Sequence, residues 1–226
     1  MPVPNFPNGL IVSCQAYKGY ALHGAIHMAA VARAADMGGA VGIRANGISD
    51  IVAIRAATAL PIVGIQKIEV ADPMTSVYIT PDIASASGIA HAGCNAVAVD
   101  GSQRERRSGE TLRQLIDFIH TQLHQLVMAD CSCLTDAYYA RACGADVLAT
   151  TLAGYAAHGR AKTDGPDFNF LARLVNEFAD VPVVAEGRYE TPEQVQHAFA
   201  LGAHAVVVGT ALTRPEVIVK RFAQRA

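Results

Sequence analysis

The sequence has no hydrophobic run long enough to cross a bilayer and no large excess of either charge. Its apolar stretches fall well short of the roughly 20 residues that a membrane-spanning helix needs. The formal net charge of the 226-residue chain is −2, which gives no electrostatic footprint for nucleic acid or for an anionic membrane surface. The N-terminal residues MPVPNFPNG lack the basic region of a signal peptide. We therefore expect neither nucleic acid nor a membrane as a partner.

Cysteines in metal-binding or disulfide patterns are also missing. The five cysteines are Cys14, Cys94, Cys131, Cys133 and Cys143. Their number is odd and most lie in or beside apolar runs, which is typical of reduced thiols in a cytoplasmic protein. Cys131 and Cys133 do not have the spacing of a zinc finger and have no second pair. None of the eight histidines has a ligand-like partner in the sequence, so we predict no metal site.

The chain also lacks low-complexity segments and any obvious linker. With 51% hydrophobic and 17% charged residues, it has ample material for one core, and we expect a single domain over residues 1–226. What it does contain is a repeat. Glycines at positions 38, 93, 144 and 202 each follow a helix-like segment and precede an apolar strand. Each is expected to be the left-handed residue that ends a helix.

Eight short apolar segments are expected to be strands, and helical segments separate them. The strands are expected at residues 10–15, 40–44, 61–67, 95–100, 126–130, 146–150, 182–187 and 204–209. Thr80, Thr191 and Thr213 each stand before or near a proline and are expected to begin helices. Alternation of this kind predicts an α/β fold, a compact (β/α)8 TIM barrel. An open doubly wound sheet is the alternative, although no Gly-rich dinucleotide fingerprint follows the first strand.

Two of these strands end in groups that can exchange protons. Residues 182–188 read PVVAEGR and end in Glu186, whereas residues 61–67 read PIVGIQK and end in Lys67. The chain has only four lysines, and the other three lie in expected loops or a helix. Because chemistry in this barrel takes place at the carboxyl ends of the strands, Lys67 and Glu186 are expected to face each other across one mouth.

A phosphate site is predicted beside this pair. Gly187 and Arg188 follow the seventh strand, and Gly209 and Thr210 follow the eighth. These two loops commonly cradle phosphate in such barrels, because backbone N–H groups converge there and glycine permits close approach. Arg188 or Arg214 could add a charged fork. The alternative is that Gly209 is only a turn.

Other polar residues end the remaining strands. Gln15, Arg44, Asp130 and Thr150 are candidates for binding substrate hydroxyl or carbonyl groups, although Arg44 could instead pair with a carboxylate such as Asp130. The long segment 151–167 contains three glycines and is expected to be a functional loop, with a lid as one option. The arginines at positions 104, 106 and 107 are expected to lie in a solvated loop.

The segments IRANG, VGIQK, YITP, MADCS and VVAEGR occur in that order. With them the sequence resembles the N-acetylmannosamine-6-phosphate 2-epimerases of sialic-acid catabolism, nearly from end to end. That family more often has a Gly-Gly or similar small pair where this chain has Gly209-Thr210. The resemblance implies conversion of N-acetylmannosamine 6-phosphate to N-acetylglucosamine 6-phosphate without a cofactor. It also implies a lysine base at Lys67 and an acid at Glu186, with contacts from Gln15, Arg44 and Asp130.

Two other functions remain open from the residues alone. A lysine at a strand end can form a Schiff base with a phosphorylated keto-sugar, which would make the protein an aldolase. A barrel that binds phosphosugars without catalysis is the third possibility. We further expect a homo-oligomer, a dimer or higher, in which the terminal helix over residues 214–226 packs on its own barrel or on a neighbour's.

Overall fold

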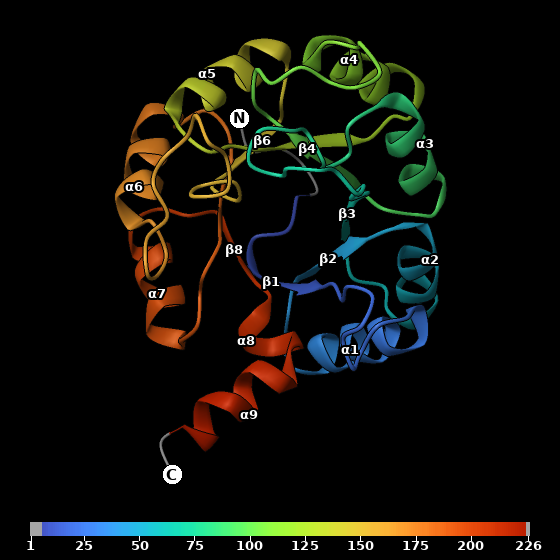
Figure 1. Ribbon diagram of the computed structural model, residues 1–226, viewed down its shortest axis with the longest axis vertical. Helices are drawn as coiled ribbons and strands as arrows, with labels where there is room; N and C mark the ends of the chain where they lie inside the picture. Colours follow the sequence, from blue (N-terminus) through green and yellow to red (C-terminus); the bar gives the residue numbers. More distant parts are fainter. Residues whose placement is uncertain (1–5, 225–226) are drawn as a thin grey trace.

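Eight parallel strands close into a barrel in the computed structural model, which describes residues 6–224 (Figure 1). The strands are β1 (Gly9–Cys14), β2 (Gly42–Asn46), β3 (Ile62–Ile65), β4 (Ala96–Asp100), β5 (Leu126–Asp130), β6 (Val147–Ala149), β7 (Val183–Glu186) and β8 (Ala205–Val208). They pair in sequence order, and β1 pairs with β8. The predicted (β/α)8 barrel is therefore confirmed, and closure excludes the open doubly wound sheet.

Helices surround the barrel and alternate with the strands (Figure 1). They are α1 (Ala25–Met37), α2 (Ile48–Ala57), α3 (Ile83–His91), α4 (Leu112–Gln122), α5 (Leu134–Cys143), α6 (Phe168–Glu177) and α7 (Pro192–Ala200). After β8 come a short helix α8 (Thr210–Thr213) and a last helix α9 (Pro215–Ala223). None of the helices within residues 6–224 is both long and apolar enough to cross a membrane.

Alternation along each strand divides the core into two layers. Ile11, Val63 and Val184 belong to a cluster that fills the barrel, whereas Val12 and Val183 belong to the cluster that the helices cover. Successive side chains on a strand point to opposite faces, so every second residue faces the interior. This parity decides which of the residues at the strand ends can face the barrel mouth.

Glycine lies at the end of several helices, and one of the four predicted left-handed glycines needs correction. Gly93, Gly144 and Gly202 have φ angles of 104°, 108° and 96°, so the predicted left-handed conformation is confirmed there. Gly38 is right-handed with a φ of −82°, and its prediction was wrong. Gly39, at a φ of 87°, takes the left-handed turn one residue later.

The three predicted threonine caps have different outcomes. Thr191 forms a full capping box at the start of α7, as expected. Thr80 does not begin α3, because Asp82 caps that helix by accepting from the Ser85 backbone N–H. Thr213 does not begin α9 either, since it closes α8 and its hydroxyl donates to the carbonyl of Gly209.

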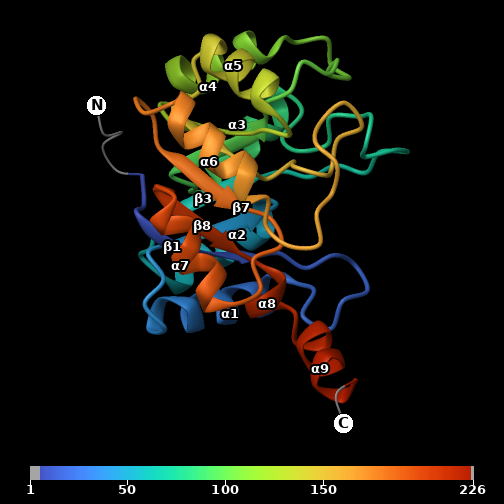
Figure 2. The same cartoon turned by 90° about the vertical axis from the view of Figure 1, so that its left-hand side faces the viewer.

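The last helix packs little against the rest of the molecule. α9 has no buried residue, and Figure 2 shows it pointing away from the barrel. Val219 and Phe222 on this helix are 64% and 76% exposed. Residues 1–5 of the chain lie outside the part that the structure describes, and so do residues 225 and 226 at the end of the expected terminal helix.

Candidate active site

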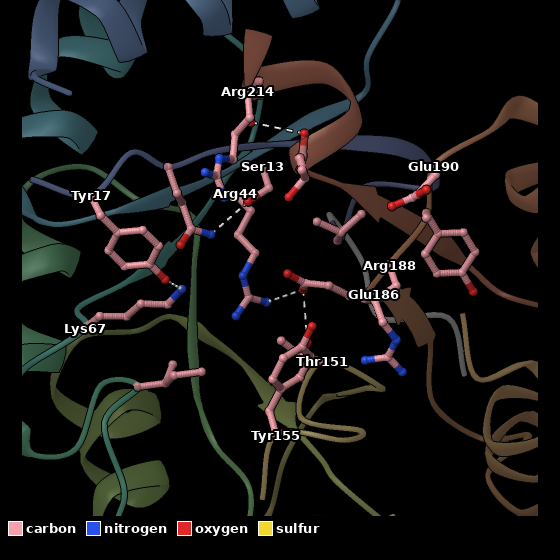
Figure 3. Close-up of a pocket in the computed structure, with 18 of the residues that line it drawn as sticks. Ser13, Tyr17, Arg44, Lys67, Thr151, Tyr155, Glu186, Arg188, Glu190 and Arg214 are labelled. Carbon is pink, nitrogen blue, oxygen red and sulfur yellow. Dashed lines mark hydrogen bonds and ion pairs between the residues drawn. The ribbon is translucent and has the colours of Figure 1, made fainter. Parts of the chain in front are cut away.

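A cavity of about 490 Å³ opens at the carboxyl ends of the strands (Figure 3). Nine of the residues that the sequence singled out line it: Gln15, Arg44, Lys67, Glu186, Gly187, Arg188, Gly209, Thr210 and Arg214. Lys67 and Glu186, which lie 119 positions apart in the sequence, therefore share one cavity. Figure 3 shows them on either side of the Arg44 guanidinium.

Strand parity explains this convergence. Val63 and Ile65 fill the barrel, so Lys67, two residues further along, faces the same interior. Val184 places Glu186 there in the same way, and Met128 places Asp130. β3 itself ends at Ile65, and Lys67 is held just beyond it by a bridge to Ile79 and by a 2.8 Å bond from its backbone N–H to Asn46 Oδ1.

One buried arginine sets the charge of the pocket floor. Arg44 is 1% exposed and donates to both oxygens of Asp130, at 3.1 and 2.5 Å. Its Nη1 also lies 2.9 Å from Glu186 Oε2. Burial lowers the pKa of Arg44, but the charges of Asp130 and Glu186 raise it by more than burial lowers it. The net pKa is therefore raised, and the guanidinium stays charged. The pairing with Asp130 that the sequence left open is therefore present.

Glu186 has a raised pKa. Burial is the largest cause, since it disfavours the charged form, and the nearby Asp130 charge adds to it. The charges of Arg44 and Lys67 act in the opposite direction without cancelling the effect. A carboxyl group with this environment holds its proton to higher pH than a free glutamate, which suits it to act as a general acid.

Lys67 is paired with an aromatic hydroxyl rather than with a carboxylate. Its Nζ donates to the hydroxyl of Tyr17 at 2.9 Å and lies 5.2 Å from the centre of that ring. Tyr17 belongs to the segment between β1 and α1 and is 50% exposed. The amine thus reaches the open side of the cavity, where a substrate can meet it.

The predicted phosphate residues follow β7 and β8, which are neighbouring strands of the barrel, and all of them line the cavity. Gly187 has a φ of 113° and Arg188 a φ of 62°, so the backbone turns sharply after β7. Gly209 is the residue before α8, and Arg214 stacks 4.1 Å from the Tyr20 ring centre while pairing with Glu216 at 2.8 Å.

Arg188 is also tied to the long loop. It donates to the carbonyls of Ala153 and Gly165, both at 2.8 Å, and to the Thr163 hydroxyl at 3.0 Å. These bonds fasten the loop over residues 151–167 to the rim of the cavity.

Thr150 and Asp130 do not line the cavity. The hydroxyl of Thr150 donates to the Glu186 carbonyl and accepts from the Glu186 backbone N–H, both at 2.9 Å. Thr150 therefore joins β6 to β7 behind the site. The next residue, Thr151, has inward parity and lines the cavity, with its hydroxyl between Asp130 and Glu186.

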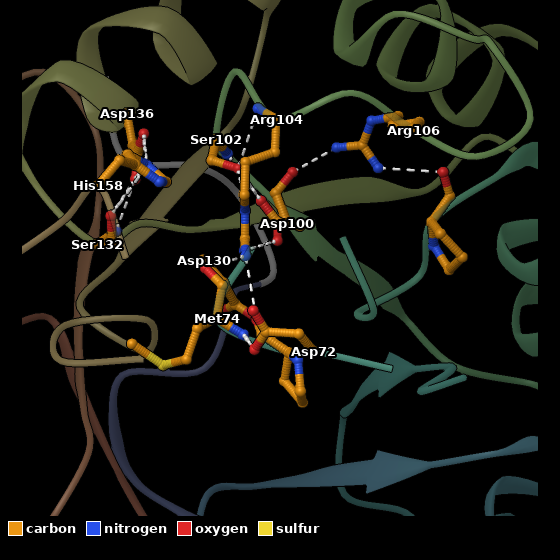
Figure 4. Close-up of polar contacts among 12 residues, drawn as sticks. Asp72, Met74, Asp100, Ser102, Arg104, Arg106, Asp130, Ser132, Asp136 and His158 are labelled. Carbon is orange, nitrogen blue, oxygen red and sulfur yellow. Dashed lines mark hydrogen bonds and ion pairs between the residues drawn. The ribbon is translucent and has the colours of Figure 1, made fainter. Parts of the chain in front are cut away.

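The expectation of a solvated arginine loop was wrong for two of its three residues (Figure 4). Arg106 is 3% exposed and donates to the carbonyls of Pro81 and Asp100. Arg104 pairs with the Asp100 carboxylate at 2.5 Å. Only Arg107 is exposed. At the end of β4 the buried Asp100 thus binds Arg104 through its carboxylate and Arg106 through its backbone carbonyl, and local sequence patterns gave no sign of either contact.

His158 does have a partner, contrary to the sequence reading. Its Nε2 lies 3.0 Å from Asp136 Oδ1 and 3.4 Å from the Ser132 hydroxyl (Figure 4). Cys133, Asp136 and His158 offer possible metal ligands within 4.8 Å of one another. Asp136 already accepts from the Ser132 backbone and hydroxyl and from His158, so the group satisfies itself and anchors the long loop to α5.

Sequence reasoning missed the aromatic lining. Five tyrosines border the cavity: Tyr17, Tyr20, Tyr78, Tyr155 and Tyr189. Burial raises the pKa of Tyr78 to about 12, so this phenol keeps its proton. The YITP segment, which includes Tyr78, contributed to the family resemblance, whereas the other four tyrosines lie in loops whose course depends on tertiary contacts.

The fold and this cavity define the class of protein. It is a (β/α)8 barrel with an amine, a carboxyl group and an arginine in a cavity at the carboxyl ends of the strands. Residues 28–226 match the family described as "Putative N-acetylmannosamine-6-phosphate epimerase". The chain belongs to this N-acetylmannosamine-6-phosphate epimerase family.

Individual relatives agree over nearly the whole chain. A 2-epimerase of that name from Cutibacterium acnes is 43% identical over 221 residues, which cover 97% of this chain and 94% of the relative. One from Clostridioides difficile is 42% identical over 213 residues, covering 94% and 93%. The solved N-acetylmannosamine-6-phosphate 2-epimerase from Clostridium perfringens superposes with a TM-score of 0.90 at 40% identity, covering 97% of this chain and 93% of that structure.

Proposed function

We propose that this protein is a 2-epimerase that converts N-acetylmannosamine 6-phosphate to N-acetylglucosamine 6-phosphate. The observation that carries the proposal is the placement of Lys67 and Glu186 in one cavity of a chain that belongs to the epimerase family. Inverting carbon 2 requires removing its proton on one face and returning a proton on the other. A base and an acid on two sides of one cavity supply this.

The reaction starts from the open-chain aldehyde, which makes the proton on carbon 2 acidic. In the proposed reaction the nitrogen of Lys67 takes that proton, and the electron pair of the C–H bond moves to the carbonyl oxygen as an enolate. Arg44 lies between the two groups (Figure 3) and stays charged, so it is the candidate to stabilise the oxyanion. Protonated Glu186 then returns a proton to carbon 2 from the opposite face. Lys67 and Glu186 exchange protons with water before the next turnover.

The remaining rim residues are assigned to substrate binding. The backbone N–H groups after Gly187 and Gly209 and the guanidinium of Arg214 are proposed to hold the phosphate. Gln15, whose amide donates to the Ser13 hydroxyl at 2.8 Å, faces the cavity and is proposed to bind a sugar hydroxyl. Asp130 is proposed to act through Arg44, because it lies beneath the guanidinium and outside the cavity lining.

Proton NMR of N-acetylmannosamine 6-phosphate in D₂O tests this function directly. The proposal predicts the appearance of N-acetylglucosamine 6-phosphate together with deuterium at carbon 2 of the product. Tight binding with no deuterium uptake would instead identify a barrel that binds phosphosugars without catalysis.

The aldolase remains the alternative, because Lys67 also has the position of a Schiff-base lysine. Borohydride treatment in the presence of substrate separates the two. The epimerase proposal predicts no covalent adduct, whereas mass spectrometry of an adduct on Lys67 would support the aldolase.

We also propose that the protein assembles as a homo-oligomer in which α9 contributes to the contact. The support is the lack of any buried residue on α9 and the exposure of Val219 and Phe222.

The cysteines suit a cytoplasmic location. Four of the five free cysteines are buried, which suits a protein of the reducing cytoplasm.

A further inference from the structure

Thr151 bridges the two carboxyl groups of the pocket. Its Oγ1 lies 2.7 Å from Asp130 Oδ1 and 3.0 Å from Glu186 Oε2. β6 ends at Ala149 with its side chain inside the barrel, and parity carries Thr151 to the same interior. The hydroxyl is therefore fixed between Asp130 and Glu186 by the strand that precedes it, and Figure 3 shows its contact with Glu186.

A count of protons limits how these contacts can form. A hydroxyl group has one proton to donate, and ionised carboxylates only accept. If Asp130 and Glu186 were both ionised, one of the two short oxygen–oxygen contacts of Thr151 would have no proton in it. Each contact has a proton of its own only if one carboxyl group is protonated and donates to Thr151 Oγ1.

Arg44 decides which carboxyl group carries the extra proton. It donates to both oxygens of Asp130, and a two-point pairing of this kind favours the ionised form. Its approach to Glu186 is a single contact at 2.9 Å. Glu186 is therefore the proton holder, in agreement with the upward direction of its pKa.

We propose that Thr151 is a positioning residue that accepts the proton of Glu186 and donates its own proton to Asp130. The chain of bonds runs from Glu186 O–H to Thr151 Oγ1 and from Thr151 O–H to Asp130. It holds the acid form of Glu186 with a fixed orientation in the cavity. The inference rests on the proposed function, because it specifies how the acid of that reaction is kept protonated.

A purely structural role for Thr151 predicts the opposite response to mutation. If the hydroxyl only donated to an ionised Glu186, its loss would destabilise the charged form and move the titration of Glu186 to higher pH. If it accepts from protonated Glu186, its loss destabilises the acid form and moves the titration to lower pH. The sign of the change therefore distinguishes the two accounts.

The groups that face Glu186 are few. Arg44 comes from β2, Asp130 from β5, Lys67 from the segment after β3 and Thr151 from the segment after β6. On β8 the residue in register with Glu186 is the uncharged Val207. A change at Thr151 that leaves Arg44, Asp130 and Lys67 in place thus isolates the hydroxyl.

The test is carbon-13 NMR of glutamate side-chain carboxyl groups in the ligand-free protein, with the Glu186 signal assigned by its loss in Glu186→Gln. In Thr151→Val, which keeps the shape and removes the hydroxyl, the Glu186 midpoint is expected to fall by about one pH unit, because a hydrogen bond of this kind is lost. Thr151→Ser keeps the hydroxyl and is expected to titrate close to wild type.

A midpoint in Thr151→Val that is unchanged or higher would overturn the proposal, and so would a Ser variant that shifts as far as the Val variant. Thr151→Ala replaces Val if the Val variant does not fold. Since the titration needs no substrate, a failure here is separate from a failure of the epimerase proposal, which the D₂O experiment on the wild-type protein decides.

Discussion

At the scale of single residues, Arg44 balances two buried carboxyl groups. Replacing it with methionine leaves Asp130 and Glu186 without the guanidinium that pairs with both. We expect Arg44→Met to lower the free energy of unfolding by about 3–5 kcal/mol, measured by urea denaturation near neutral pH.

The matched control is Arg141→Met. Arg141 pairs with Asp180 at 2.8 Å, but the two side chains are 41% and 61% exposed. Solvent screening limits such a pair to less than about 1 kcal/mol. Equal losses in the two variants would contradict the assignment of a charge-balancing role to Arg44.

Glu186 gives a prediction about pH. Its folded pKa is raised above 4.5, so the folded protein keeps a proton that the unfolded chain releases. Stability is therefore lost as pH rises from about 4.5 through the folded pKa of this residue. Glu186→Gln has no such loss, and its stability relative to wild type is expected to increase over that interval. Denaturant unfolding of both proteins across the pH range measures it, and parallel curves would refute the raised pKa.

At the scale of elements, the alternation of side chains along each strand explains which residues at the barrel mouth the sequence could predict and which it could not. The apolar runs located the eight strands, and Lys67 and Glu186 were recognised because each follows such a run. The same approach selected Thr150, the last residue of the expected strand. β6 ends one residue earlier, and parity turns Thr150 outward and Thr151 inward. A residue at a strand end can therefore be assigned to the barrel mouth only when it is also known whether its neighbours face the barrel interior or the surrounding helices.

Contacts between distant loops were outside the reach of local patterns. The burial of Arg104 and Arg106 depends on Pro73 and Pro81, which lie between β3 and α3, as well as on Asp100 at the end of β4. The anchor of His158 on Asp136 depends in the same way on where the long loop folds back. Charge clusters and single histidines look solvated in a sequence because their partners are set by tertiary structure.

The loop over residues 151–167 gives a prediction for an element. Gly154 has a φ of 82°, and a Cβ there would lie 2.6 Å from Lys162 Cα. Gly154→Ala must push apart the two sides of the loop that brings Tyr155 to the cavity. We expect at least a severalfold fall in kcat/KM, measured with N-acetylmannosamine 6-phosphate.

Gly39→Ala is the control for the strain of a left-handed alanine. Gly39 has a φ of 87° and nothing within 4 Å of its added Cβ. Both variants share a backbone strain of about 1–2 kcal/mol, but only the first disturbs the loop. A comparable loss of kcat/KM in Gly39→Ala would show that general destabilisation causes the effect.

At the scale of the whole molecule, the exposed face of α9 bears on assembly. Replacing Phe222, which is 76% exposed, by serine is expected to weaken the proposed oligomer, because apolar contact area is lost. Analytical ultracentrifugation measures the change. Met37→Ser on α1, where the side chain is 82% exposed, is expected to leave the assembly unchanged. A wild-type protein that is monomeric at every protein concentration measured would contradict the role given to α9.

The proposed reaction depends most on Lys67 acting as the base at carbon 2. The measurement that tests it is release of label from N-acetylmannosamine 6-phosphate deuterated at carbon 2, followed by NMR in H₂O for wild type and for Lys67→Ala. The account predicts that wild type exchanges the deuterium for solvent hydrogen and that Lys67→Ala, correctly folded by circular dichroism, exchanges it at least a hundredfold more slowly. Loss of the label at the wild-type rate in Lys67→Ala would contradict it.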